Sequence, residues 1–258
     1  MCGRFAQYRM PWEYLEPLGL QIPLVGGVDP EPINRYNVAP RSRVRILHQD
    51  PDDLRWDLVP WGWEPFWAKG KRPPAINARS ETAATGKFFR SIWETGRCIV
   101  PADGWYEWVE NPDEPGKKQP FYIHRHDKQP MYFAAIGQFR REGGEPLDGD
   151  GFVIITADSD QGMVDIHDRR PVVLSPQSAA EWMDPELASA EAERILHQEC
   201  EPVEALEWYP VRRAIGNVKN EGAGLLERVS GSDVKVYWQT TKHLSMWREG
   251  KKRRYYIV

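Results

Sequence analysis

The sequence has few cysteines, and their spacing suggests no pairing. Only Cys2, Cys98 and Cys200 occur among 258 residues, and none of them forms a CxxC pair. Disulfide-stabilised secreted domains and structural zinc sites need denser or paired cysteines. The HRH run at 124–126 also lacks the ligand spacing of a zinc site. We therefore expect reduced thiols, no metal, no cofactor and a cytoplasmic protein, associated with the nucleoid if the source is bacterial.

The sequence also lacks a long apolar run and an excess of positive charge. No stretch approaches the roughly 20 apolar residues that span a membrane, and no basic segment followed by an apolar one stands at the start of the chain. Mean hydropathy is -0.63 and the net charge is -4. Neither a membrane partner nor a protein that coats nucleic acid through its overall charge is expected. A local basic groove remains compatible with these numbers.

Aromatic residues, by contrast, are plentiful, with 12 tryptophans in the chain. Strand-like segments such as RCIVPADGWYEWV, FYIHR, MYFAAIGQFRR and GFVIITADS are separated by connections rich in Gly and Pro. This pattern predicts an antiparallel or mixed sheet in a single α+β domain. We assign residues 1–228 to that domain, and residues 229–258, with their strand-like VKVYW, to a C-terminal extension.

Three helical regions are predicted. The segment MPWEYLEPLGL favours a brief helix interrupted near Pro17, and residues 80–96 favour a helix that ends at Gly96. Ser175-Pro176 and Asp184-Pro185 each place a capping side chain before a proline, which predicts two successive helix starts.

The most unusual chemistry lies at Cys2. Methionine aminopeptidases remove Met1 when the next side chain is small, which would leave Cys2 with a free α-amine beside its thiol. An aldehyde condenses with such an amine to an imine, and the neighbouring thiol then closes a five-membered thiazolidine ring. An α-amine pKa of about 7.7 to 8.0 leaves a useful neutral fraction at neutral pH. Cys98 and Cys200 cannot react in this way because their nitrogens are in peptide bonds.

This chemistry requires proton transfer and an amide that orients the aldehyde. Glu107 in PADGWYEW, His167 in VDIHDRRP and Asn77 in NARSET are the candidates. By residue type alone, a partly exposed strand position is favoured for this glutamate between tryptophans, and a structural role for the lone histidine.

The segments together resemble one family. They are MCGRF, RYNVAP at 35–40, WGW at 61–63, NARSETA at 77–83, RCIVPADGWYEW at 97–108, FAAIG at 133–137, DIHDRRPVVL at 165–174 and GNVKNEG at 216–222. In this order, over about residues 2–226, they are similar to the SOS-response-associated peptidase (SRAP) family.

The resemblance implies a SRAP-like domain whose strongly bent, barrel-like sheet is flanked by short helices. It implies a sensor of abasic sites in single-stranded DNA, including sites at junctions with duplex DNA, that crosslinks itself to the lesion through Cys2. Asn77 would orient the sugar and the amine, Glu107 would assist opening of the abasic sugar, and His167 would act as acid and base. We expect a monomer.

The resemblance also implies DNA contacts. Guanidinium and amide groups suit the backbone, and exposed aromatic rings can stack on bases. The residues implied are Arg4, Asn37, Pro40, Phe66, Trp67, Arg79, Trp108 and Arg169. Simple packing is an equal alternative for Trp108.

Two other functions use the same residues. A thiol peptidase of the N-terminal-nucleophile type, acting on itself or on other chains, would use Cys2, Glu107 and His167. A non-covalent reader of single-stranded or modified DNA would need the arginine and aromatic residues, with Cys2 incidental. Replacement of Cys2 by alanine separates crosslinking from non-covalent binding.

Overall fold

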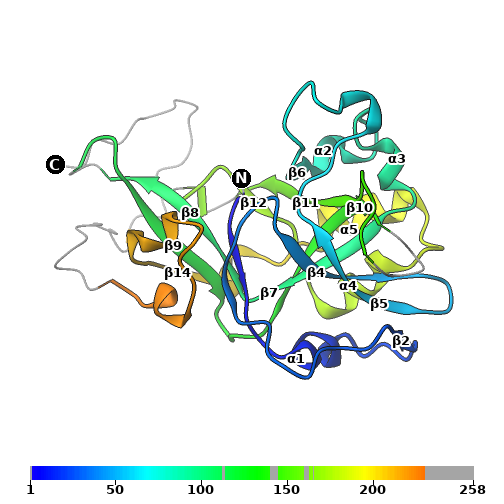
Figure 1. The fold of residues 1–258 in the computed structure, drawn as a ribbon, viewed down its shortest axis with the longest axis horizontal. Coiled ribbons are helices and arrows are strands. Elements are labelled where there is room, and N and C mark those ends of the chain that lie inside the picture. Colours follow the sequence, from blue (N-terminus) through cyan, green and yellow to red (C-terminus); the bar gives the residue numbers. More distant parts are fainter. Residues whose placement is uncertain (1, 112–113, 140–144, 160–162, 165, 230–258) are drawn as a thin grey trace, which may run out of the picture.

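The structure, a computed structural model, describes residues 2–111, 114–139, 145–159, 163–164 and 166–229. Two β-sheets dominate it, and short helices flank them (Figure 1). Residues 230–258 of the predicted 229–258 extension, with its strand-like VKVYW, lie outside the described residues. None of the helices in the described ranges is long and apolar enough to cross a bilayer.

Among the described residues, a five-stranded sheet has the order β14-β9-β8-β1-β3. Its pairings are all antiparallel. The strands are β1 (Phe5–Gln7), β3 (Arg35–Val38), β8 (Gly104–Glu110), β9 (Lys118–Arg125) and β14 (Leu206–Pro210).

The larger, nine-stranded sheet has the order β12-β11-β10-β7-β4-β5-β2, with β13 paired to β10 and β6 to β11. It is mixed, because β6 runs parallel to β11 and β2 runs parallel to β5. Its strands are β2 (Leu24–Val25), β4 (Arg43–Gln49), β5 (Leu54–Pro60), β6 (Asn77–Arg79), β7 (Arg97–Ala102), β10 (Met131–Gln138), β11 (Gly151–Asp158), β12 (Arg169–Pro171) and β13 (Val173–Leu174). The α+β class with mixed sheets is thus confirmed. The described strands close no barrel, so the barrel-like shape is not confirmed.

The helices agree with the sequence at some positions and differ at others. They are α1 (Pro11–Leu15), α2 (Ser80–Ala83), α3 (Arg90–Trp93), α4 (Pro176–Met183) and α5 (Ser189–Gln198). The first is followed by a 3-10 turn that contains Pro17, as expected. The start of α4 is confirmed as well, because Ser175 Oγ accepts a hydrogen bond from Ser178 N at 3.1 Å.

The predicted continuous helix over 80–96 is wrong. The chain leaves the helix after Ala83 and forms a turn in which Gly86 N donates to Thr82 O. Phe88 and Phe89 then pack against Trp63, with ring centroids 5.9 and 6.3 Å away. Burial of these rings against the larger sheet decides the path here.

The second predicted helix start, at Asp184, is also wrong. The Asp184 side chain accepts from Glu186 N in a turn, and α5 begins only at Ser189. The carbonyl groups of Asp184 and Leu187 accept hydrogen bonds from the buried guanidinium of Arg97. In a helix that began at Asp184, these carbonyl groups would accept hydrogen bonds from backbone N–H groups. Here the Arg97 guanidinium is the donor instead.

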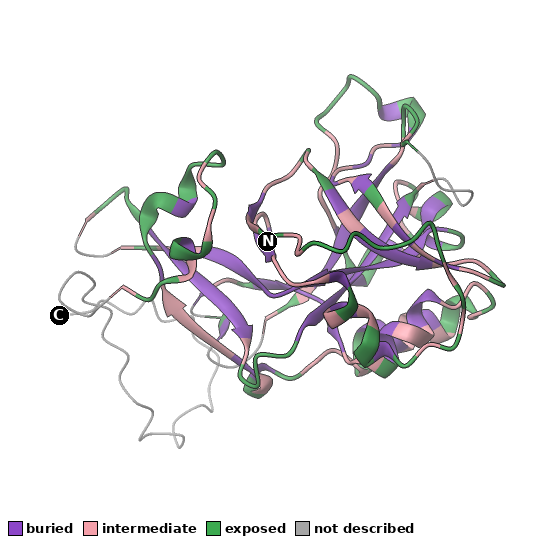
Figure 2. Ribbon diagram, turned by 60° about the horizontal axis from the view of Figure 1, so that its bottom comes forward, coloured by how far each residue is buried: buried purple, intermediate pink, exposed green. Residues whose placement is uncertain are grey.

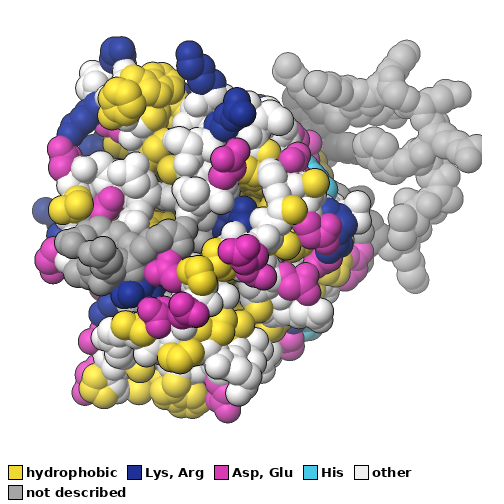
Figure 3. All heavy atoms as spheres, turned by 90° about the vertical axis from the view of Figure 1, so that its right-hand side faces the viewer, with side chains coloured by type: hydrophobic (Ala, Val, Ile, Leu, Met, Phe, Trp, Pro, Cys, Tyr) yellow, Lys and Arg dark blue, Asp and Glu magenta, His cyan; other side chains and the backbone are white. Residues whose placement is uncertain are grey.

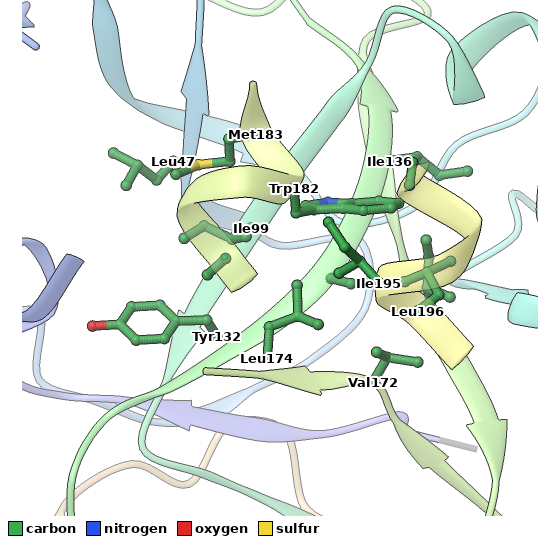
Figure 4. Close-up of a cluster of buried hydrophobic side chains, with 14 of the residues drawn as sticks. Leu47, Ile99, Tyr132, Ile136, Val172, Leu174, Trp182, Met183, Ile195 and Leu196 are labelled. Carbon is green, nitrogen blue, oxygen red and sulfur yellow. The ribbon is translucent and has the colours of Figure 1, made fainter. Parts of the chain in front are cut away.

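Two large hydrophobic clusters stabilise the fold. One lies between the nine-stranded sheet and the helices α4 and α5, around the fully buried ring of Trp182 (Figure 4). The other contains side chains from both sheets, and in it Phe133 of β10 meets Phe5 of β1 and Trp105 of β8 edge-on, each at 6.0 Å. Buried strands, coloured purple in Figure 2, run through both sheets. The second cluster holds the two sheets together and so positions the start of the chain.

Candidate active site at the start of the chain

The start of the chain lies between the two sheets, near β8 and β12 (Figure 1). Cys2 precedes β1 and is fully buried. Its carbonyl oxygen accepts a hydrogen bond of 2.9 Å from Asn77 Nδ2. The pairing of β1 with β8 continues beyond the strand, because Tyr106 N donates to Arg4 O at 2.9 Å. Cys2 is therefore held from both sheets.

Burial also determines the protonation state of Cys2. Desolvation raises the pKa of its thiol well above the ordinary value, and Glu107 raises it further when that carboxyl group is ionised. A thiol in this state is neutral at physiological pH and is a weak nucleophile. Such a thiol is better suited to closing a ring on an imine that has already formed than to making the first attack on a carbonyl group.

Glu107 comes from β8, where the side chain is only 5% exposed. Desolvation raises its pKa to about 8. At neutral pH this carboxyl group is thus mostly protonated and can donate a proton. Such a pKa, close to the working pH, is what general acid catalysis requires.

His167 lies in the connection between β11 and β12. Its Nε2 is 4.0 Å from Glu107 Oε2, and its Nδ1 is 2.7 Å from Asp168 Oδ1. The backbone N–H of Arg169 also points at Nδ1, at 3.0 Å. Partial burial is the main cause of the lowered pKa of His167. The ring is therefore mostly neutral at neutral pH and 31% exposed.

Asn77 begins β6, which pairs in parallel with β11 opposite Ile154. Its Nδ2 binds Cys2, whereas its Oδ1 is buried and has no hydrogen-bond partner within the described part of the chain. A buried amide oxygen without a partner is costly. It is an available acceptor for a ligand beside Cys2.

The structure thus brings Cys2, Asn77, Glu107 and His167 together from four separate segments. A thiol, an amide, a neutral carboxyl group and an imidazole lie close together here, and such a set of groups suits condensation and ring-opening chemistry at a carbonyl group.

The predicted DNA contacts near Cys2 have internal partners in this structure. Arg4 Nη1 donates to Asn37 Oδ1 at 2.6 Å and to Ile215 O at 2.9 Å, and the guanidinium lies 5.7 Å from the centre of the Trp108 ring. The amide of Asn37 is buried and donates to Asn217 O and Asn220 O. These side chains tie the 215–220 turn to the site.

Arg169, also predicted to contact DNA, is buried as well. Its guanidinium pairs with Glu81 of α2 at 2.7 Å and with Asp158 at the end of β11. This link joins the NARSET segment to the connection that carries His167, and so keeps Asn77 and His167 in one site.

The other predicted contacts are accessible. Arg79 is exposed and Pro40 is half-buried. Phe66 and Trp67 are 89% and 43% exposed. The Trp67 ring meets Phe88 edge-on at 5.7 Å, and Arg72 lies over Phe88 at 4.1 Å.

Figure 3 shows hydrophobic side chains beside Lys and Arg side chains at the top of the molecule, where Figure 1 places α2 and α3. We call Phe66, Trp67 and Phe88 the aromatic patch. Its basic neighbours Lys69, Lys71 and Arg72 are all exposed.

The sequence analysis missed three residues of this region. Asp168 follows His167 directly, and this adjacency was the available signal. Glu81 lies within NARSETA, but nothing in the sequence pairs it with Arg169. Phe88 was part of the predicted helix, and its place beside Trp67 depends on the turn at Gly86.

The chain is similar to proteins of known type. The model of the family described as SOS response associated peptidase (SRAP) matches residues 1–218. The chain is 50% identical to the abasic site processing protein YedK of Escherichia coli, over 89% of this chain and 100% of that protein. It is 32% identical to the abasic site processing protein YoqW of Bacillus subtilis, over 88% and 99% of the two chains. A crystal structure of a phage-related protein from Bordetella bronchiseptica has a TM-score of 0.67 and 40% identity, and covers 82% of this chain and 95% of its own.

Proposed function

Because the chain belongs to the SOS response associated peptidase (SRAP) family, we propose that it senses abasic sites in DNA and crosslinks itself to them through Cys2. Single-stranded DNA, including its junctions with duplex, is the proposed partner. The proximity of Cys2, Asn77, Glu107 and His167 to one another is the observation that carries this proposal.

The first step makes the lesion reactive. An abasic sugar is mostly a closed ring and reacts as an aldehyde only after the ring opens. The protonated carboxyl of Glu107 donates a proton to the ring oxygen as the C1–O bond breaks. A proton leaves the anomeric hydroxyl at the same time, and His167 Nε2 accepts it. Asn77 orients the sugar beside the amine.

The second step forms the crosslink. After removal of Met1, the neutral α-amine of Cys2 adds to the aldehyde, and the carbinolamine loses one water to give the imine. The thiol then adds across the C=N bond. Its sulfur binds the carbon, and its proton passes to the nitrogen, which closes a thiazolidine. Only one water is lost overall, and no oxidant or cofactor is needed. The raised pKa of the thiol supports this order, because the amine is then the better first nucleophile.

The raised pKa of the Cys2 thiol also argues against general proteolysis as the principal activity. A cysteine peptidase attacks with a thiolate, and burial keeps this thiol neutral. Removal of Met1, by an aminopeptidase or by the chain itself, remains part of the proposal, since it exposes the amine. We further propose a monomer in the cytoplasm or on the nucleoid, whose SRAP domain ends near residue 228.

Intact mass spectrometry tests the proposal directly. The protein is measured before and after incubation with a single-stranded oligonucleotide that carries one abasic site. We expect the mass of the chain without Met1, followed by a new species equal to protein plus oligonucleotide minus one water. Absence of that species, with Met1 removed and the lesion intact, would contradict the proposal. An oligonucleotide without the lesion is the control.

The aromatic patch is proposed to hold the DNA beside the lesion. Stacking on one ring contributes about 1 to 3 kcal/mol per base. Phe66→Ala is therefore expected to weaken binding of single-stranded DNA roughly 5- to 150-fold, measured by fluorescence anisotropy. Crosslinking at saturating DNA should be nearly unchanged. Trp12→Ala is the matched control, since Trp12 on α1 is a 54% exposed aromatic residue outside the patch. Equal effects of the two variants would contradict the assignment.

A further inference from the structure

The two ring nitrogens of His167 face different groups. Asp168 Oδ1 lies 2.7 Å from Nδ1, and Arg169 N lies 3.0 Å from the same nitrogen. On the other side of the ring, Nε2 is 4.0 Å from Glu107 Oε2. The proton of a neutral imidazole can sit on either nitrogen.

Asp168 and Arg169 compete for Nδ1. The Arg169 N–H can only donate, so it needs a lone pair on Nδ1. The Asp168 carboxylate can only accept, so it needs a proton on Nδ1. Since a neutral ring holds one proton, the first arrangement puts that proton on Nε2, whereas the second leaves a lone pair there. The partner of Nδ1 therefore decides whether His167 is a donor or an acceptor toward Glu107.

The gap between Nε2 and Glu107 is suited to a shared ligand. At 4.0 Å the two atoms are too far apart for a direct hydrogen bond. A sugar hydroxyl or a water at ordinary hydrogen-bond distance from both atoms can bridge them. Burial keeps Glu107 mostly protonated, so it is the donor of the pair. The complementary state of Nε2 is the acceptor, which requires the proton on Nδ1.

We propose that Asp168 is a positioning residue that holds the proton of His167 on Nδ1 and presents Nε2 as a proton acceptor opposite Glu107. This rests on the proposed function, in which both groups act on the abasic sugar. The positive charge of Lys118 on β9 lowers the pKa of His167 and does not select a tautomer in this way.

Asp168 is well placed for a clean test. Its side chain is 81% exposed, so its replacement should leave the core intact. The neighbouring Arg169 is anchored through its guanidinium to Glu81 and Asp158. The backbone N–H at this position therefore stays beside Nδ1 when Asp168 is changed.

The first experiment measures the tautomer without DNA. Protein labelled with 15N-histidine is compared with Asp168→Asn by NMR of the imidazole nitrogens, and His167→Gln assigns the signal. We expect the variant to shift its proton to Nε2 and to have a lower His167 pKa. Glu145→Gln is the matched control, because it removes an 83% exposed carboxylate that pairs with Arg43 rather than with His167 or Arg169. An unchanged tautomer in Asp168→Asn would overturn the proposal.

The second experiment measures crosslinking against pH. Asp168→Asn is expected to slow crosslinking of a natural abasic site about tenfold across the pH range, the equivalent of about 1.4 kcal/mol, while the acid side of the profile stays where the α-amine of Cys2 sets it. Asp168→Glu should restore much of the rate. A variant with the wild-type rate and profile would overturn the proposal. Failure of the proposed function is a different result, in which the wild-type protein forms no adduct although the tautomer shift is still seen.

Discussion

Replacing Cys2 by alanine is expected to abolish the covalent adduct with abasic single-stranded DNA. An alanine at the start of the processed chain keeps the α-amine, so it can still form an imine. It has no sulfur, and the reversible imine cannot close into a ring. On a denaturing gel without a reducing agent such as borohydride, we expect no stable product, against near-complete conversion of the wild-type protein.

Two measurements make this result specific. Non-covalent binding of single-stranded DNA should persist in Cys2→Ala and weaken with salt, because phosphate contacts do not need the thiol. Cys200→Ala is the matched control, since Cys200 is a partly exposed cysteine that packs against the other hydrophobic cluster and its nitrogen is in a peptide bond. A comparable loss of adduct in Cys200→Ala, or a stable adduct in Cys2→Ala, would contradict the role of Cys2.

The second large effect is expected at Glu107. Replacement by glutamine preserves the size and much of the hydrogen bonding of this buried side chain, but removes its acidic proton. General acid catalysis contributes about 10²- to 10⁴-fold, so Glu107→Gln should slow crosslinking of a natural abasic site by about 100-fold or more. An oligonucleotide with an open-chain aldehyde needs no ring opening and should react with both proteins at similar rates. Equal losses on the two substrates would make Glu107 a structural residue.

The pH dependence of Glu107 gives an independent check. Its pKa of about 8 means that the carboxyl group loses its proton as pH rises through that value. The wild-type rate on the natural lesion should therefore fall above about pH 8, whereas Glu107→Gln should lack this decline. The amine requires the opposite change, because it must lose its proton to react. The wild-type profile is thus expected to be bell-shaped.

The same raised pKa affects stability. In the unfolded chain Glu107 ionises near its ordinary value of 4.5, and in the folded protein near 8. Between these values the unfolded state releases a proton that the folded state keeps, so the free energy of unfolding falls as pH rises through this window. In Glu107→Gln, which has no titrating carboxyl group at this position, this fall in the free energy of unfolding is absent. The Tm of Glu107→Gln relative to wild type should rise between about pH 5 and about pH 8.5, as measured by calorimetry. A constant difference would contradict the raised pKa.

Local signals predicted part of the fold well. The cap at Ser175 could be predicted because the serine side chain accepts a hydrogen bond from a backbone N–H only three residues further along the chain. The helix predicted over 80–96 was not, because Phe88 and Phe89 reach Trp63, far away in sequence. Likewise, Arg97 binds the carbonyl groups at 184 and 187 across more than 80 residues. Contacts of this kind leave no local pattern.

By itself the sequence determined the proposed reagent, because removal of Met1 would leave an amine and a thiol on adjacent carbons of Cys2. Covalent connectivity alone would make that pair able to form a thiazolidine. Only the tertiary structure decided which groups lie beside Cys2 and in which protonation state. Residues 2, 77, 107 and 167 meet because two sheets pack together, and the pKa of Glu107 and the proton of His167 depend on burial and on through-space distances. Those quantities arise when water is excluded and distant segments come into contact.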